Sequence, residues 1–404
     1  MEKYEYKEYR KSTDIHGVAL YPAVMVAPMQ RDVLEKIIPL KSKMKIVDPF
    51  HGSGTALYES AEVSNSCILY GCDINPFANL ITKSKLMGLD DSIKQDINNM
   101  TIDILYRDFT MHHFNNIEKW FRDDIINDLS RIKSAISRVT SYKNRLYLWC
   151  VFSNIIRKYS NTRTDTYKLY SKSDDKILLT KNNVIDEFLK KAVDSIELYK
   201  DITNEFHLVK SDVNNYLKSI EDNYFDICIT SPPYGDNPTT VPYGQFSSLP
   251  LMWIDPEDLD LEGWELNNYS IIDNRSLGGN KNNIYSLNEY HINLINDTLQ
   301  GISAKKQTKV LSFFADYFKT LDQIVRVTDK YIVMTLGNRT VDRVNIDLTT
   351  ITKMYLEMKG FINTDTISRK IIRKRMPSRT SRVNNNSVNS INKEFLIIHQ
   401  KTQE

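Results

Sequence analysis

Apolar residues in the first part of the chain follow two alternating patterns. Residues 45–48 and 67–73 are short apolar runs of the kind that form buried strands. The segments 56–63 and 75–87, which follow them, space their apolar residues as helices do. Strand, turn, helix, strand and helix thus succeed one another within about forty residues, a rhythm typical of a parallel α/β sheet.

This alternation of strand and helix patterns stops after residue 90 and resumes near residue 206. Apolar spacing over 117–136 and 145–159 predicts amphipathic helices in the interrupting stretch. The same spacing recurs later and predicts helices over 310–328 and 348–358. The strand candidates of the second part are 206–209, 225–230, 331–337 and 393–401.

These patterns predict an α/β fold, a doubly wound sheet with helices on both faces that carries a mainly helical insertion. Residues 1–90 and 206–404 would form the sheet, and residues 91–205 the insertion. The polar residues 1–20 predict a loose arm. Residues 235–305, which are polar and rich in Asn, Gly and Tyr, are hard to assign to helix or strand.

The composition is that of an ordinary soluble protein, with 41% hydrophobic and 26% charged residues among 404. No apolar run approaches the roughly 18 residues that would span a membrane, and the charged N-terminus lacks the core of a secretory signal. We therefore expect a cytoplasmic protein without a membrane partner. The net charge of +2 does not by itself indicate a polyanionic partner, but basic residues gather around 157–181 and 369–382.

The four cysteines form no Cys-x-x-Cys pair, so neither a zinc site nor a redox motif is indicated. Cys72 and Cys228 lie in apolar, strand-like runs and are expected to be small core residues. No metal ligand set is predicted.

The first segment with chemical content is the turn Asp48–Thr55, which joins a strand to a helix. Gly52 and Gly54 lack Cβ atoms and would let a ligand approach the backbone closely. The free N–H groups at the start of the helix suit a carboxylate. A phosphate-binding P-loop would need Gly-Lys before Thr55, and a dinucleotide fingerprint would need a third glycine. A plain glycine turn remains the alternative.

The second segment is Asp73, at the end of the next strand. In doubly wound folds an acid in this position accepts hydrogen bonds from ribose hydroxyls. Asp73 lies 19 residues beyond Gly54, close to the spacing of about 20 that such sites use. A helix N-cap is the alternative role for this side chain.

The third segment, Thr230–Tyr234, directly follows the strand candidate 225–230 and contains two consecutive prolines. Prolines stop a sheet and stiffen the chain, so a plain strand terminator is one reading. The same stop would also hold a polar side chain, a carbonyl and an aromatic ring at the carboxyl edge of the sheet. Ligands bind at that edge in open α/β sheets.

Together, DPFHGSGT and the later TSPPY resemble the amino-methylating (cytosine-N4 and adenine-N6) DNA methyltransferase family. The resemblance covers about 1–90 and 205–404, with weaker matches in YPAVMVAPM, GCDIN, VKSDV and YIVMTLGNRTVDR. It implies a Rossmann-like methyltransferase sheet, with 1–90 as the cofactor-binding half and 206–404 as the catalytic half. The insertion, 91–205, would then be available for DNA recognition.

The resemblance also assigns roles to individual residues. It implies that S-adenosyl-L-methionine is the cofactor. The implied catalytic residues are Ser231, Pro232, Pro233 and Tyr234. The implied cofactor-binding residues are Pro22, Asp48, Phe50, His51, Gly52, Gly54, Thr55, Asp73, Ile74 and Asp212.

The chemistry of amino methylation explains why such a motif would be needed. An exocyclic amine is a poor nucleophile because its lone pair is delocalised into the ring. Two acceptors that pull on its N–H bonds would free the lone pair, and our candidates are Ser231 Oγ and the Pro232 carbonyl. The base must leave the duplex to be reached, and Tyr234 is placed to stack on it.

The first residue of the motif bears on which base is methylated. Methylation at carbon 5 of cytosine needs a Pro-Cys nucleophile, and none of the four cysteines follows a proline. Ser231 resembles cytosine-N4 enzymes more than adenine-N6 enzymes. Open alternatives are adenine-N6 DNA methylation, amino methylation of RNA, a catalytically silent nucleic-acid-binding relative, and an unrelated Rossmann-type binder.

Relatives of this kind usually belong to restriction–modification systems, so the implied partners are double-stranded DNA and a cognate restriction endonuclease. Basic and polar residues in three segments are candidates for DNA contacts, although each segment could equally be solvated surface. The candidates are Arg157, Lys158, Asn161 and Arg163 in the insertion, Asp236 and Asn237 after the Pro-Pro motif, and Arg373 and Arg375 near the C-terminus.

Overall fold

The computed structural model describes residues 5–39, 42–235, 240–261, 271–277, 283–371 and 393–402. Within them, seven strands form one mixed sheet with the order β3-β2-β1-β4-β5-β9-β8. In this order the strands are Phe206–Lys210, Ile68–Asp73, Lys45–Asp48, Phe225–Thr230, Thr328–Leu336, Lys393–Lys401 and Phe361–Lys370. The first five are parallel, whereas β9 runs antiparallel to both β5 and β8. The predicted α/β fold is confirmed.

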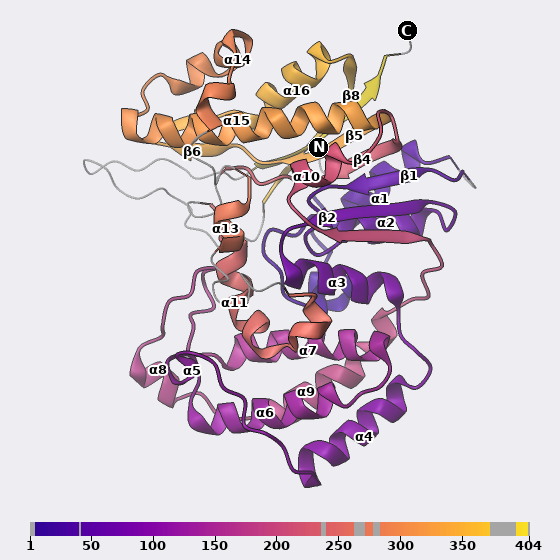
Figure 1. Cartoon of the computed structure of the whole chain (residues 1–404), viewed down its shortest axis with the longest axis vertical. Helices are drawn as coiled ribbons and strands as arrows, with labels where there is room; N and C mark the ends of the chain where they lie inside the picture. Colours follow the sequence, from indigo (N-terminus) through magenta and orange to yellow (C-terminus); the bar gives the residue numbers. More distant parts are fainter. Residues whose placement is uncertain are drawn as a thin grey trace.

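Helices cover both faces of this sheet (Figure 1). One face is covered by α1 (Ala27–Ile37), α2 (Thr55–Val63) and α3 (Pro76–Met87). The other is covered by α10 (Val213–Lys218), α15 (Ala304–Val327) and α16 (Leu348–Met358).

Alternation of side chains along the strands explains the two layers. Successive residues of a strand point to opposite faces. Ile46 and Ile227 therefore join the core beneath α1 to α3, whereas Val47 and Cys228 join the core beneath α10, α15 and α16. All four side chains are completely buried, as the near-continuous apolar runs of a parallel sheet require.

The chain order places a switch point between β1 and β4. From β1 the chain proceeds outward to β2 and β3, whereas from β4 it proceeds to β5 on the other side. The two loops that leave β1 and β4 therefore diverge and open a crevice at the carboxyl edge. The glycine turn follows β1, and Ser231–Tyr234 follows β4.

The segment between α3 and β3 is helical and lies at the lower end of the molecule in Figure 1. Its helices are α4 (Ile93–Tyr106), α5 (Ile117–Trp120), α6 (Asp123–Ser137), α7 (Tyr142–Tyr159), α8 (Asp174–Leu178) and α9 (Val184–Asp194). The central helix, α7, packs against α3 of the sheet layer and against α11 (Tyr243–Trp253). Its side chains are buried on most sides, which fits its apolar sequence.

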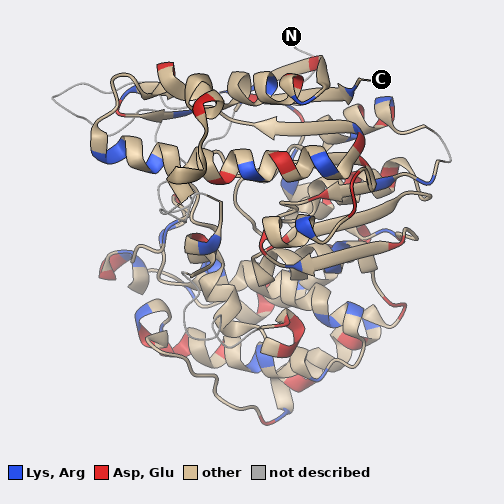
Figure 2. Cartoon of the chain, turned by 45° about the horizontal axis from the view of Figure 1, so that its top comes forward, with Lys and Arg blue, Asp and Glu red and all other residues tan. Residues whose placement is uncertain are grey.

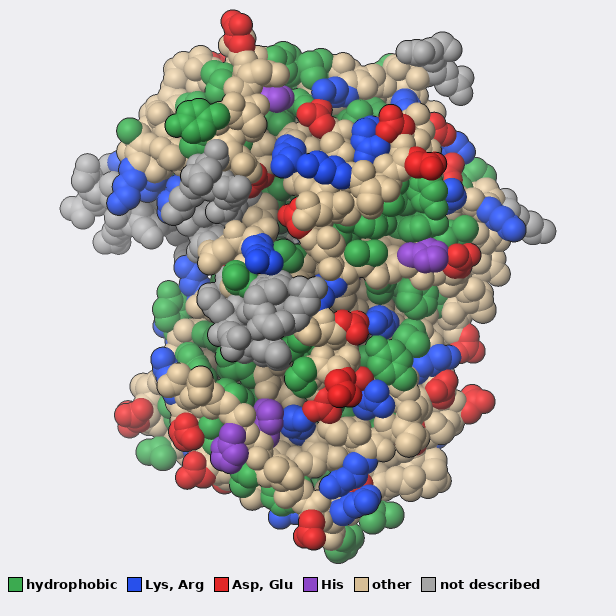
Figure 3. All heavy atoms as spheres, viewed as in Figure 1, with side chains coloured by type: hydrophobic (Ala, Val, Ile, Leu, Met, Phe, Trp, Pro, Cys, Tyr) green, Lys and Arg blue, Asp and Glu red, His purple; other side chains and the backbone are tan. Residues whose placement is uncertain are grey.

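The remaining elements lie between and above these parts. Within the described residues, and apart from short 3-10 helices, they are α13 (Ile271–Arg275), α14 (Glu289–Leu299) and the hairpin β6 (Arg339–Val341) and β7 (Val344–Ile346). Acidic and basic residues are intermixed along the chain (Figure 2), and their side chains are interspersed on the face that Figure 3 shows. Among the described residues, no helix combines the length and the apolar character that crossing a bilayer would require.

Two sequence-based expectations need correction. The predicted loose arm, 1–20, is wrong for its second half, because Ile15, His16 and Val18 are buried in the core. The strand β8 was not predicted, since its sequence FINTDTISRK is largely polar. It is one of the two edge strands, paired only with β9 among the described strands, and buries little more than Phe361 and Ile367.

One buried carboxylate links the helical segment to the rest of the chain. Asp258, which is 6% exposed, lies just beyond α11. It accepts hydrogen bonds from Arg145 Nε at 2.7 Å, Arg145 Nη2 at 2.9 Å and Trp149 Nε1 at 2.7 Å, all from α7. These bonds satisfy polar groups that would otherwise lose solvent without compensation.

We expect Asp258→Ala to lower the free energy of unfolding by roughly 2–4 kcal/mol, because it leaves Arg145 and the Trp149 indole without their acceptor. Urea denaturation followed by circular dichroism measures this. The control is Asp165→Ala, which removes an ion pair with Arg163 whose side chains are 54% and 63% exposed. Equal denaturation midpoints for the two variants would contradict the assigned role of Asp258.

Candidate functional site

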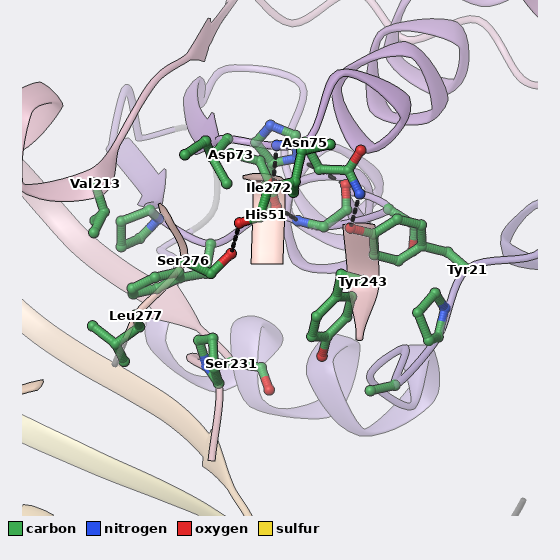
Figure 4. A pocket seen from close by; sticks show the side chains of 18 of the residues that line it. Tyr21, His51, Asp73, Asn75, Val213, Ser231, Tyr243, Ile272, Ser276 and Leu277 are labelled. Atoms are coloured by element: carbon green, nitrogen blue, oxygen red, sulfur yellow. Dashed lines mark hydrogen bonds between the residues drawn. The ribbon is translucent and has the colours of Figure 1, made fainter. Parts of the chain in front are cut away.

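A cavity lies at the carboxyl edge of the sheet, where the loops after β1, β2, β3 and β4 meet (Figure 4). Seven separate segments of the sequence contribute to its wall. The lining residues are Tyr21 to Met25, Pro49 to Ser53, Thr55, Asp73 to Asn75, Ser211 to Val213, Ser231, Pro233, Tyr243, Ile272 and Arg275 to Leu277. This is the edge at which open α/β sheets bind ligands.

The glycine turn has a backbone that few other residues could adopt. Gly52 and Gly54 have φ angles of +51° and +72°, in the left-handed region that favours glycine. A Cβ atom on Gly54 would lie 2.6 Å from the Thr82 side chain of α3. The turn therefore lies directly against α3, and Gly54 is the N-cap residue that immediately precedes α2.

Asp73 is held in a fixed orientation at the end of β2. Its Oδ2 accepts a hydrogen bond from the Gly52 N–H at 2.9 Å, and its Oδ1 accepts one from the Asn75 N–H at 2.8 Å. Burial raises the pKa of Asp73, while the nearby His51 lowers it. Each carboxylate oxygen retains capacity for a second donor, and the side chain lines the cavity.

Asp48 lies beneath the cavity and does not line it. Its Oδ1 accepts hydrogen bonds from Thr230 Oγ1 at 2.6 Å and from the Phe50 N–H at 3.1 Å. Its Oδ2 is buried and has no hydrogen-bond partner among the described residues. Burial raises the pKa of Asp48 to about 7, although both hydrogen bonds lower it.

A chain of buried polar groups supports the glycine turn from below. Lys85 Nζ donates to the Ser53 carbonyl at 2.6 Å and to His16 Nδ1 at 3.0 Å. His16 Nε2 donates to Glu59 Oε1 at 2.9 Å, and Arg31 Nε donates to Glu59 Oε2 at 2.7 Å. Burial lowers the pKa of Lys85 to about 8 and raises that of Glu59 to about 7. Sequence patterns gave no sign of this network.

An aromatic wall faces the glycine turn. The rings of Tyr21 and Tyr243 lie 5.7 Å apart between centroids, and Asn75 Nδ2 donates to the Tyr21 hydroxyl at 3.1 Å. Tyr243 begins α11. The backbone N–H groups of the next two residues, Gly244 and Gln245, each donate to the Asp273 carboxylate of α13 at 2.9 Å. Sequence reasoning missed this wall, because the five residues of α13 are too few for a recognisable helical period.

The residues after β4 divide between the cavity and the interior behind it. Ser231 and Pro233 line the cavity, whereas Pro232 and Tyr234 do not. The Tyr234 hydroxyl lies 3.3 Å from Ser231 Oγ and 3.3 Å from Glu394 Oε1. The ring that the sequence suggested for stacking on a base thus lies behind Ser231 in this structure.

The other predicted cofactor residues are also mostly at the cavity. The structure brings eight of them to its wall: Pro22, Phe50, His51, Gly52, Thr55, Asp73, Ile74 and Asp212. Asp48 and Gly54 lie immediately behind it. Asp212 also caps α10, accepting from the N–H groups of Asn214 at 3.0 Å and Asn215 at 3.1 Å. Thr55 Oγ1 is buried and has no partner among the described residues.

The predicted DNA contacts of the insertion need partial correction. Arg157 and Asn161 are 5% and 8% exposed, so neither can reach a phosphate directly. Arg157 Nη2 donates to the Thr166 carbonyl at 3.0 Å, and its guanidinium lies 4.8 Å from the Phe246 ring centroid. Lys158 and Arg163 are exposed, and each pairs with an acid. Asp236, Asn237, Arg373 and Arg375 lie outside the described residues.

The sheet with helices on both faces and a cavity at its switch point is the fold of a Rossmann-like methyltransferase. The chain is 29% identical over 417 residues to a protein of Kocuria varians named Type II methyltransferase M.MvaI. The alignment covers 95% of this chain and 90% of that relative. The sequence of this chain matches no protein-family model. The similarity supports membership of the DNA methyltransferase family and leaves the methylated base open.

The buried Asp48 predicts a specific pH dependence of stability. Its pKa of about 7 in the folded protein lies above the ordinary value of 3.8, so folding is coupled to proton uptake between these values. The contribution of Asp48 to stability is therefore largest near pH 4 and is lost as the pH rises through 7.

We expect Asp48→Asn to remove this loss, because an amide keeps the acceptor for Thr230 and the Phe50 N–H but carries no charge. The variant should be more stable than the wild type at pH 8, by an amount on the order of 4 kcal/mol at most, and the difference should shrink toward pH 5. Urea denaturation at several pH values tests this. Parallel curves for the two proteins would exclude Asp48 as the source.

Proposed function

We propose that this protein is an S-adenosyl-L-methionine-dependent DNA methyltransferase that methylates the exocyclic amine of a flipped base in a specific DNA sequence. The supporting observation is that Ser231 and the glycine turn line one cavity at the switch point of the sheet. The similarity to a type II methyltransferase along nearly the whole chain supports the same proposal. A plain strand terminator or a plain glycine turn would not require this juxtaposition.

The cavity wall fits the groups of the cofactor. The positively polarised start of α2 and the buried, unpartnered Thr55 Oγ1 suit its polar amino-acid end. Asp73 is oriented by two backbone N–H groups and can accept from ribose hydroxyls. When bound, the cofactor supplies a methyl group on a sulfonium sulfur, a reactive centre that needs no activation by the protein.

The chain's own residues would then position and polarise the amine. Ser231 Oγ, which lines the cavity, would accept a hydrogen bond from one N–H of the amine and help to make its lone pair available for attack on the methyl group. The Pro232 carbonyl, although Pro232 does not line the cavity in this structure, is our candidate acceptor for the other N–H. Two prolines in succession hold these acceptors rigidly at the end of β4, so little ordering is needed when the base enters. Positioning would provide most of the rate acceleration.

We propose cytosine N4 as the target, because serine precedes Pro-Pro-Tyr. Adenine N6 is the alternative, and nucleoside analysis separates the two. We also propose a role in a restriction–modification system, which the similarity to a protein named a type II methyltransferase supports, and a cognate restriction endonuclease as a partner.

For DNA, we propose that the exposed Lys158 and Arg163 contact phosphates, because these side chains reach the surface of the helical segment. We retain Asp236 and Asn237 for polar contacts near the base, and Arg373 and Arg375 for the backbone. The division into two sheet halves, 1–90 and 206–404, with residues 91–205 serving recognition, is part of this proposal.

We expect DNA from a host that expresses the protein to contain N4-methylcytosine, measured by digestion and nucleoside mass spectrometry. Ser231→Ala should lower the amount by at least about 100-fold, because the amine loses one acceptor, while binding of S-adenosyl-L-methionine stays unchanged. Ser219→Ala is the control, since that hydroxyl donates to the Tyr216 carbonyl at the end of α10. N6-methyladenine in place of N4-methylcytosine would refute the choice of base.

We expect isothermal titration calorimetry to show binding of S-adenosyl-L-methionine and none of NAD. Asp73→Ala should weaken the binding by roughly 10- to 100-fold, because it removes the oriented acceptor for the ribose. Asp222→Ala, at an exposed ion pair with Arg326, is the control. Unchanged affinity in Asp73→Ala would exclude the ribose role, and preferential binding of NAD would refute the cofactor.

A further inference from the structure

We propose that Glu394 is a positioning residue that fixes the direction of a hydrogen-bond chain from Ser231 through Tyr234. This chain would make Ser231 Oγ a hydrogen-bond acceptor toward the cavity. The inference rests on the proposed function, in which Ser231 accepts from the amine of a base. It extends the site to the last strand of the sheet, 160 residues beyond Tyr234.

The geometry places Tyr234 between the two other groups. Its hydroxyl oxygen lies 3.3 Å from Ser231 Oγ and 3.3 Å from Glu394 Oε1. The other carboxylate oxygen of Glu394, Oε2, accepts a hydrogen bond from Arg369 Nε at 2.8 Å and lies 2.8 Å from Arg369 Nη2 in an ion pair. Arg369 and Glu394 are directly opposite each other on β8 and β9, and each side chain is only 12% exposed.

The proton count sets the direction of the chain. A carboxylate can only accept, so the single hydroxyl proton of Tyr234 must point toward Glu394. The Tyr234 oxygen is then available as an acceptor, and the single proton of Ser231 points toward it. Ser231 Oγ is left with its lone pairs, which is the state that binding of an amine N–H requires. Burial and the nearby Glu394 raise the pKa of Tyr234, so the phenol keeps its proton.

The position of the Tyr234 ring is also fixed. A Cβ atom on Gly337, at the end of β5, would lie 2.6 Å from Cε2 of the ring. The absence of a side chain at Gly337 therefore lets the ring lie directly against the backbone of the central sheet. With the ring held there and Arg369 holding Glu394, the hydroxyl has little freedom to choose another partner.

The experiment measures kcat for methyl transfer with the full-length protein, tritiated S-adenosyl-L-methionine and unmethylated DNA that contains the target site. We expect Glu394→Gln to lower kcat about 10-fold, because a carboxamide can donate to Tyr234 and no longer dictates the proton direction. The KM for DNA and the affinity for the cofactor should stay within about twofold of the wild type, since neither ligand contacts Glu394 in this scheme.

Tyr234→Phe and the double variant test whether the two residues act as one chain. Tyr234→Phe removes the hydroxyl but keeps the ring, and should lower kcat at least as much. Adding Glu394→Gln to it should cause no further loss, because the connecting hydroxyl is already absent. The control is Asp322→Asn, which alters a similar trio, Tyr355, Asp322 and Lys359, on α15 and α16. It should leave kcat unchanged.

A wild-type kcat in Glu394→Gln, or multiplying losses in the double variant, would overturn the inference. If Glu394→Gln does not fold, the kcat of Tyr234→Phe tests the inference instead, and a wild-type kcat in that variant would also overturn it. Absence of methyl transfer by the wild-type protein on any DNA would instead refute the proposed function, which keeps the two failures distinct.

Discussion

The site depends on one pairing, that of β1 with β4 in the middle of the sheet. The hydrogen bond from Thr230 Oγ1 to Asp48 closes this pairing at its carboxyl end and joins residues 182 positions apart in the sequence. Asp48 begins the glycine turn, and Thr230 precedes Ser231. Because both side chains are completely buried, neither can exchange its partner for water, so the two motifs are held in register.

The cavity wall requires almost the whole chain. Tyr21 comes from the N-terminal segment, Asp73 from β2, Ser231 from β4 and Tyr243 from α11, which itself packs on α7 of the helical segment. Asp258 ties that segment back through three hydrogen bonds. A ligand in the cavity would therefore contact a surface that exists only once the sheet and the helical segment have assembled around it.

Buried polar groups around the site fix one another's orientation through hydrogen bonds. Two carboxylates among them accept from donors whose positions are fixed: Asp73 accepts from two backbone N–H groups, and Glu394 accepts from Arg369 on the neighbouring strand. Burial is costly for such groups, and satisfied hydrogen bonds offset part of that cost. These hydrogen bonds fix the orientation of the acceptor groups before any ligand binds.

The sequence by itself determined the parallel sheet and the turn chemistry. Apolar runs such as 225–230 are typical of strands buried on both faces, and Gly52, Gly54 and the prolines after Thr230 impose local geometry that depends on few neighbours. The polar edge strand β8, the short helix α13 and the buried network of His16, Lys85 and Glu59 were decided by tertiary structure alone. Their residues are polar or their elements short, so only partners far along the chain make them favourable, and no local pattern records such partners.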